Sequence, residues 1–178
     1  MEPASPPSRH DLSDPARFRT FYEGAVRKVY AYLYDRCGGI QAVAEDLTQV
    51  TFLAAVEQIR TGSRIDHPTA WVMGIARHKL VDHYRRRERE ERRLRLVWSA
   101  EEAAEDPDLL HHADRQLMLQ VMRTLPPAQQ SALALRYLDD LPVADVARQM
   151  GRTTIAAQSL LARARHAFLR TYREAIDE

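Results

Sequence analysis

Few residues of this chain have the types and spacing that catalysis requires. Cys37 is the only cysteine, and two glycines follow it with no basic partner close in sequence, which favours a buried thiol over a nucleophile. His78 and Asp82 are four positions apart and could share a metal ion, but one such pair is a weak signal. His111 and His112 stand in a polar stretch that we expect to be solvated. With no glycine-rich phosphate loop and no serine elbow, the sequence predicts a protein that is not an enzyme, with no cofactor and no metal.

A different chemistry is suggested by the charges, which are strongly segregated although the formal net charge is only +1. Between positions 77 and 95 there are only four acidic residues. The basic residues in the same stretch are Arg77, Lys79, Arg85, Arg86, Arg87, Arg89, Arg92, Arg93 and Arg95. Such a block can neutralise phosphates. Trp71 and Tyr84 lie in or near it, and aromatic rings can accept an unstacked base. Trp71 could equally be a core residue, because aromatic residues on apolar stripes usually are.

The composition predicts an all-α protein. The chain has 178 residues, of which 45% are hydrophobic and 29% charged, enough for one medium domain or two small helical ones. Alanine, leucine, arginine, glutamate and glutamine dominate, and these residues lose little entropy in a helix. The single cysteine fits a reducing compartment, so we expect a cytoplasmic protein. The proline-containing N-terminus has no apolar core and predicts neither a signal peptide nor a membrane anchor.

Apolar residues at three-and-four spacing predict helices over 17–36, 41–59, 68–92 and 114–125. After the break at Pro126 and Pro127 comes a helix that holds Leu135 and Leu138. A short helix over 143–150, a tight corner at Gly151 and a final helix over 153–173 follow the helix-turn-helix plan.

These elements predict two small helical domains joined by a flexible acidic linker. Residues 1–14 are expected to be a disordered tail, 15–95 a first domain and 114–178 a helix-turn-helix domain. The linker is placed at 96–113, since the stretch before Asp114 contains no lysine or arginine after position 95 and is long for a loop within a compact domain.

In the last helix the spacing predicts a buried stripe of Ala157, Leu161, Ala164, Phe168 and Tyr172. Thr153, Ser159 and Arg163 consequently point another way. Thr153 is also a good N-cap, and a helix N-terminus aimed at DNA helps to position a phosphate.

The ordered motifs resemble the sigma-70 family. The run Ala44–Phe52 resembles the polymerase-binding helix of sigma region 2, and Pro68–Trp71, Ile75–Arg77 and Tyr84–Arg87 resemble its promoter-melting helix. Five later stretches resemble sigma region 4: Leu125–Gln130, Leu135–Leu138, Val146–Ala147, Gly151 and Arg163–Arg165. On this resemblance, which runs from about Phe18 to Tyr172, the chain is identified as a member of the extracytoplasmic-function (ECF) sigma factors.

The resemblance implies a site for each of three contacts. Core RNA polymerase would be bound, at its β′ clamp and β flap, with Glu45, Asp46, Gln49 and Phe52 as the region 2 contacts. The "minus ten" promoter element would be bound and melted by Trp71, Arg77, His78, Lys79, Tyr84, Arg85 and Arg86. The "minus thirty-five" element would be read by Arg152, Thr153, Gln158, Ser159 and Arg163. The family also implies an anti-sigma factor as a control partner.

Three positions depart from the family pattern. His78 stands where relatives commonly have asparagine, which we interpret as an altered base preference or contact geometry rather than a loss of the function. Gln158 and Leu160 replace two customary basic residues. Fewer phosphate contacts should weaken nonspecific affinity, while the Gln158 amide could read adenine.

Two other functions are compatible with this sequence. A helix-turn-helix regulator would bind duplex DNA independently of polymerase, and an adaptor would hold polymerase without reading DNA. The regulator leaves the basic helix and the Asp46 and Gln49 face unexplained, although such a face could also be simply solvated. The adaptor is suggested by the departures in the recognition helix.

Overall fold

The structure is a computed structural model that describes residues 12–62, 65–95 and 115–177. Within these ranges every regular element is helical, as the sequence predicts. The predicted acidic linker and most of the predicted N-terminal tail lie outside the described residues, and so does the His111–His112 pair. The domain boundaries therefore stay predictions.

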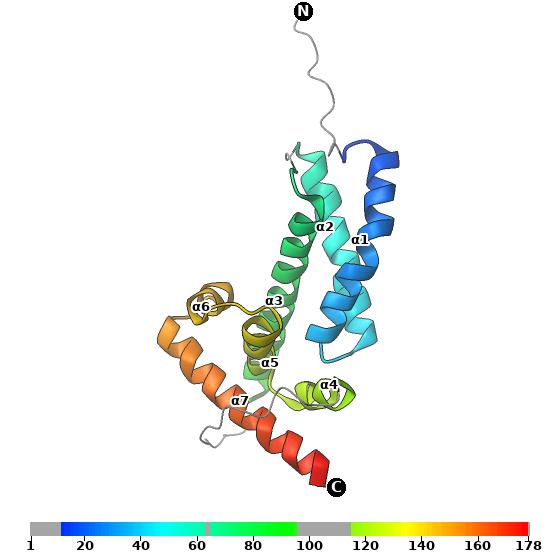
Figure 1. Cartoon of the computed structure of the whole chain (residues 1–178). Coiled ribbons are helices and arrows are strands. Elements are labelled where there is room, and N and C mark those ends of the chain that lie inside the picture. The colour runs from blue at the N-terminus through cyan, green and yellow to red at the C-terminus, as the bar shows by residue number, and fades with distance from the viewer. Residues whose placement is uncertain (1–11, 63–64, 96–114, 178) are drawn as a thin grey trace, which may run out of the picture.

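Three long helices form the first part of the fold (Figure 1). They are α1 (Pro15–Arg36), α2 (Gln41–Arg60) and α3 (Pro68–Arg95), and each packs against the other two. The Asp14 side chain caps α1 by accepting hydrogen bonds from the backbone N–H groups of Ala16 and Arg17, at 3.4 and 3.3 Å. The core between these helices contains Val29, Leu33, Ala44, Phe52, Val72 and Leu80.

The second part is built from four α-helices and one π-helical turn. The elements are α4 (Arg115–Thr124), α5 (Pro127–Leu133), η1 (Ala134–Leu138), α6 (Val143–Met150) and α7 (Thr154–Asp177). Pro127 occupies the first turn of α5, where its missing N–H costs nothing, so the predicted break at the two prolines is confirmed. The π turn η1 continues α5 by a further turn, and the N–H of Asp139 donates to the Ala134 carbonyl at 3.0 Å.

Gly151 forms the corner of the helix-turn-helix. Its φ of 62° lies in the left-handed region, which a glycine adopts without steric cost. The next N–H, of Arg152, donates to the Ala147 carbonyl at 2.9 Å and completes the end of α6.

The C-terminal half of α3 reaches into the second part of the fold. Figure 1 shows α5, α6 and α7 gathered around this end of α3, and α3 packs against both α5 and α6. Val81 of α3 belongs to an apolar cluster whose other buried members come from the second part; they are Ala132, Leu135, Val146, Met150, Leu160 and Leu161. A third cluster lies wholly within the second part and includes Val121, Leu133 and Phe168. The two parts are therefore in direct contact, with α3 shared between them.

Candidate functional site

The outer face of α2 carries a polar row beside an apolar groove. Glu45, Asp46 and Gln49 are all exposed. The groove has a volume of about 560 Å³ and runs between α1 and α2. Exposed apolar side chains line it, with Leu53 63% and Tyr22 40% exposed. A polar edge beside exposed apolar groups is the composition of a protein-binding surface.

Phe52 was expected on this exposed face, but it is buried. Its side chain is only 6% exposed, and its ring makes an edge-to-face contact with Tyr22 at a centroid distance of 4.8 Å. The reason is helical spacing, because Phe52 follows the buried Thr48 by four positions and so shares its inward face. The next residue, Leu53, is the exposed apolar residue of the pair. Phe52 also follows the buried Leu47 and Thr48 by five and four positions, and this spacing was present in the sequence.

The first half of α3 holds a half-buried tryptophan and an exposed histidine. The indole N–H of Trp71 donates to the Gln58 amide oxygen at 2.9 Å, while the ring packs against the first core and near Phe21. Trp71 is therefore partly a core residue and partly accessible. His78 is exposed and Lys79 is half-buried, one and two positions after Arg77.

Tyr84 is buried, contrary to the expectation that it faces DNA. Its side chain is 2% exposed, and its hydroxyl donates a hydrogen bond to the Arg36 carbonyl. Burial raises the pKa of Tyr84 well above its ordinary value. Leu80 precedes it by one helical turn on the same inward face. A ring held in this way has no free face for a base, so Tyr84 has a structural position.

Arg85 points toward the second part of the fold and Arg86 toward solvent. Arg85 donates to the backbone carbonyl of Gln149 in α6 and forms a long ion pair with Asp82, at 3.8 Å. Arg86 is exposed. Glu88 pairs with Arg152, which enters the final helix.

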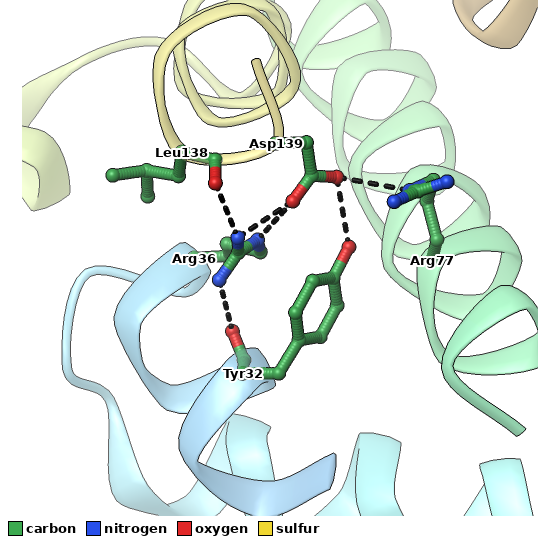
Figure 2. Close-up of polar contacts among 5 residues, drawn as sticks. All are labelled: Tyr32, Arg36, Arg77, Leu138 and Asp139. Atoms are coloured by element: carbon green, nitrogen blue, oxygen red, sulfur yellow. Dashed lines mark hydrogen bonds and ion pairs between the residues drawn. The ribbon is translucent and has the colours of Figure 1, made fainter. Parts of the chain in front are cut away.

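A carboxylate from the second part is enclosed by donors of the first part (Figure 2). The side chain of Asp139 is 1% exposed. It accepts hydrogen bonds from the Tyr32 hydroxyl at 2.9 Å, the Arg36 Nε at 2.7 Å and the Arg77 Nε at 3.0 Å. The guanidinium of Arg36 also lies over the Tyr32 ring, 3.8 Å from its centroid, and donates to the Leu138 carbonyl at 2.8 Å. Burial, and then the Asp139 charge, raise the pKa of Tyr32 to about 12. No sequence pattern predicts this cluster, since Asp139 is 62 to 107 positions away in the chain from the three side chains that donate to it.

The start of the helix-turn-helix's second helix presents polar side chains to solvent. Thr153 caps α7, as predicted, by accepting a hydrogen bond from the Ala156 N–H at 3.2 Å. Gln158, Ser159 and Arg163 are exposed on α7. Arg152 is half-buried through its pair with Glu88.

Leu160 is a core residue of the helix-turn-helix. It is 6% exposed and packs in the same cluster as Leu161 and Val81. It follows Ala157 by three positions and precedes Ala164 by four, so it lies on the buried stripe. Its apolar character is therefore explained by packing, and it is not a lost DNA contact.

The residues considered for catalysis are structural or solvated where the structure describes them. Cys37 is 3% exposed, and burial raises the pKa of its thiol to about 12, which leaves the reactive thiolate unpopulated at neutral pH. In the described ranges no three His, Cys, Asp or Glu side chains are grouped so that they could hold a metal ion. Among the described helices, none is both long and apolar enough to cross a membrane.

The fold and the helix-turn-helix define a class, the sigma-70 type of transcription initiation factor. Residues 21–90 match the family described as Sigma-70 region 2, and residues 115–167 match Sigma-70, region 4. These ranges contain, in order, the α2 face, the basic helix and the helix-turn-helix described above.

Two relatives narrow the class. The chain is 36% identical over 151 residues to the ECF RNA polymerase sigma factor BldN of Streptomyces coelicolor, an alignment that covers 83% of this chain and 57% of BldN. It is 32% identical over 155 residues to the ECF RNA polymerase sigma factor SigF of Caulobacter vibrioides, which covers 83% of this chain and 81% of SigF. The chain thus belongs to the ECF RNA polymerase sigma factors, although it spans little more than half the length of BldN.

A solved structure shares the fold. The sigma factor RpoE of Bartonella quintana, in complex with the anti-sigma factor NepR, superposes with a TM-score of 0.52 at 22% identity. The match covers 86% of this chain and 94% of that one.

Proposed function

We propose that this chain binds core RNA polymerase, directs it to specific promoters and promotes DNA melting at the start of transcription. The observation that carries the proposal is the exposed set on α7, where Gln158, Ser159 and Arg163 follow a capped helix start in a helix-turn-helix. An amide, a hydroxyl and a guanidinium at these positions suit base edges and phosphates in the major groove.

The α2 face supports the polymerase contact. Asp46 and Gln49 offer polar groups beside the groove, and Leu53 offers an exposed apolar group to a helix of the β′ clamp. Phe52 contributes by shaping the floor of this groove. We place the region 4 contact at the β flap, in keeping with the family.

The basic helix supports capture of the "minus ten" element. Arg77, His78, Lys79, Arg85 and Arg86 supply cationic or hydrogen-bonding groups, and the accessible edge of Trp71 supplies an aromatic surface. Tyr84 takes part only by holding α3 against α1. The protein would act in the cytoplasm with polymerase, without catalysing a reaction itself, and under the control of an anti-sigma factor.

Run-off transcription on a library of promoter fragments tests this function. Purified core polymerase should initiate specifically only when the protein is added. Asp46→Ala should reduce binding to core enzyme, while Glu23→Ala, at an exposed carboxylate outside the groove, should not. Arg163→Ala should reduce promoter selection with core binding intact, and Arg170→Ala on the same helix is its matched control.

Two results would replace the proposal. A protein that binds duplex promoter DNA specifically without polymerase, and does not stimulate core enzyme, is a helix-turn-helix regulator. A protein that joins core enzyme but is indifferent to Arg163→Ala is an adaptor that does not read DNA.

A further inference from the structure

The contact between the two parts of the fold is centred on a buried anion. Asp139 lies at the end of the π turn η1, and all of its side-chain partners belong to α1 and α3. The Arg36 Nη2 and the Asp139 Oδ1 are 2.6 Å apart, and the Arg36 side chain is only 11% exposed. A buried carboxylate that is shared by two guanidinium groups and a hydroxyl is a strong, directional contact.

This contact occupies groups that the proposed function assigns to DNA. The Arg77 Nε donates to Asp139, so the carboxylate uses a donor that the proposed function gives to DNA. Arg85 donates to the Gln149 carbonyl, which comes from the first helix of the helix-turn-helix. Arg152, at the entry to α7, is paired with Glu88 of α3. In this arrangement three of the cations proposed to bind DNA, Arg77, Arg85 and Arg152, are bonded across the contact between the two parts.

The dimensions of DNA add a second reason why the arrangement must open. Elements centred near "minus ten" and "minus thirty-five" are about 25 base pairs apart, roughly 85 Å of straight duplex at 3.4 Å per base pair. In the structure α3 packs directly against α5 and α6. The two promoter elements cannot be bound at the same time while the two parts of the protein are in contact.

We propose that Asp139 is an intramolecular latch that stands in for DNA phosphate and holds the free protein in a closed, DNA-incompetent form. The inference rests on the proposed function for the identity of the DNA-binding groups. Polymerase binding to both parts would supply the free energy that separates them. The Arg36 and Tyr32 partners belong to the latch alone, since neither is assigned to DNA or polymerase.

The test substitutes the latch and its sequence neighbour in the full chain. Asp139→Asn keeps the shape of the side chain but removes its charge. Asp140→Asn is the matched control, because the Asp140 side chain is 99% exposed and asparagine tolerates its positive φ of 51°. Arg36→Gln breaks the latch from the other side and serves if Asp139→Asn fails to fold, which far-UV circular dichroism would reveal.

Two measurements read the result. The radius of gyration from small-angle X-ray scattering reports opening without reference to function. Fluorescence anisotropy with labelled single-stranded and duplex DNA of mixed sequence reports access to the cations. We expect both latch variants to expand and to bind DNA at least about tenfold more tightly than the wild type, since the apparent dissociation constant scales inversely with the open fraction. Asp140→Asn should behave as the wild type does.

A folded Asp139→Asn or Arg36→Gln protein that stays compact, or that expands with no gain in DNA affinity, would overturn the latch. The run-off assay separates this failure from that of the proposed function. Latch variants that open and gain affinity while the wild type fails to support initiation leave the latch intact and remove the sigma function. If the wild type supports initiation but the latch variants stay compact and gain no DNA affinity, the sigma function stands and the latch is removed.

Discussion

The hydroxyl of Tyr84 donates a hydrogen bond to the backbone carbonyl of Arg36, across 48 positions of sequence. Arg36 is the last residue of α1, where carbonyl groups lack a partner within the helix. The Tyr84 side chain of α3 therefore supplies a donor to a carbonyl at the C-terminal end of α1. The same residue, Arg36, also makes the contact with Asp139.

Removing this hydroxyl should destabilise the first part of the fold. We expect Tyr84→Phe to lower the free energy of unfolding by about 1 to 2 kcal/mol, because a partly buried carbonyl loses its donor. Urea denaturation followed by circular dichroism measures this change. Tyr137→Phe, at a tyrosine that is 44% exposed, should leave the stability unchanged. Equal stability of Tyr84→Phe and the wild type would show that water replaces the tyrosine at this carbonyl.

Cys37 should make the stability fall at alkaline pH. Burial raises the pKa of its thiol from 9.0 to about 12, so the unfolded chain loses this proton at a lower pH than the folded protein does. Stability from this group is therefore complete below pH 9 and is lost as the pH rises toward 12. Between pH 8 and pH 10 the wild type should lose about 1 kcal/mol more than Cys37→Ala does. Denaturation curves at the two pH values test this, and identical losses would contradict the buried thiol.

Leu160 and Ile155 offer a test of which face of α7 is buried. Leu160→Ala should cost about 2 to 5 kcal/mol, since it leaves a cavity in the cluster with Val81 and Val146. Ile155→Ala should change stability by less than about 0.5 kcal/mol, because Ile155 is 76% exposed. Thermal or chemical denaturation compares the two variants. The reverse order of costs would mean that α7 is rotated from the position described.

Two glycines should respond to alanine with opposite signs. Gly151→Ala should destabilise by about 1 to 2 kcal/mol, because an L-residue is strained at a φ of 62°. Its Cβ would also lie 3.1 Å from the Arg85 guanidinium. Gly74→Ala, inside α3 with nothing within 4 Å of the added carbon, should stabilise by about 0.5 to 1 kcal/mol. Melting temperatures of the two variants should move in opposite directions, and a common direction would contradict the assigned backbone geometry.

Local pattern predicted the helices well, because the signals that begin and end a helix are short-range. Pro68 begins α3 and Pro127 begins α5 as expected, and the corner at Gly151 is present with its left-handed φ. The order of motifs was also sufficient to identify the family. The exposed positions of Asp46, Ser159 and Arg163 follow from helical spacing alone.

The burial of individual apolar and aromatic residues was predicted less reliably. Phe52, Tyr84 and Leu160 were assigned roles at the surface from the family motif or pattern, and all three are buried. Each of the three follows a buried residue, Thr48, Leu80 or Ala157, by three or four positions, and this spacing indicates the inward face. A motif compares residue types and does not state which face of the helix is covered.

The sequence by itself determined the helical class, the starts of most helices, the charge segregation and the family, since each depends on neighbours within a few turns of helix. Only the tertiary structure brought Asp139 to Tyr32, Arg36 and Arg77, and Arg152 to Glu88. These pairs are 62 to 107 positions apart, and no local periodicity encodes a contact at that range. Their proximity depends on how the two helical parts pack around α3, which is decided by the fit of apolar side chains such as Val81 against Leu135 and Leu161.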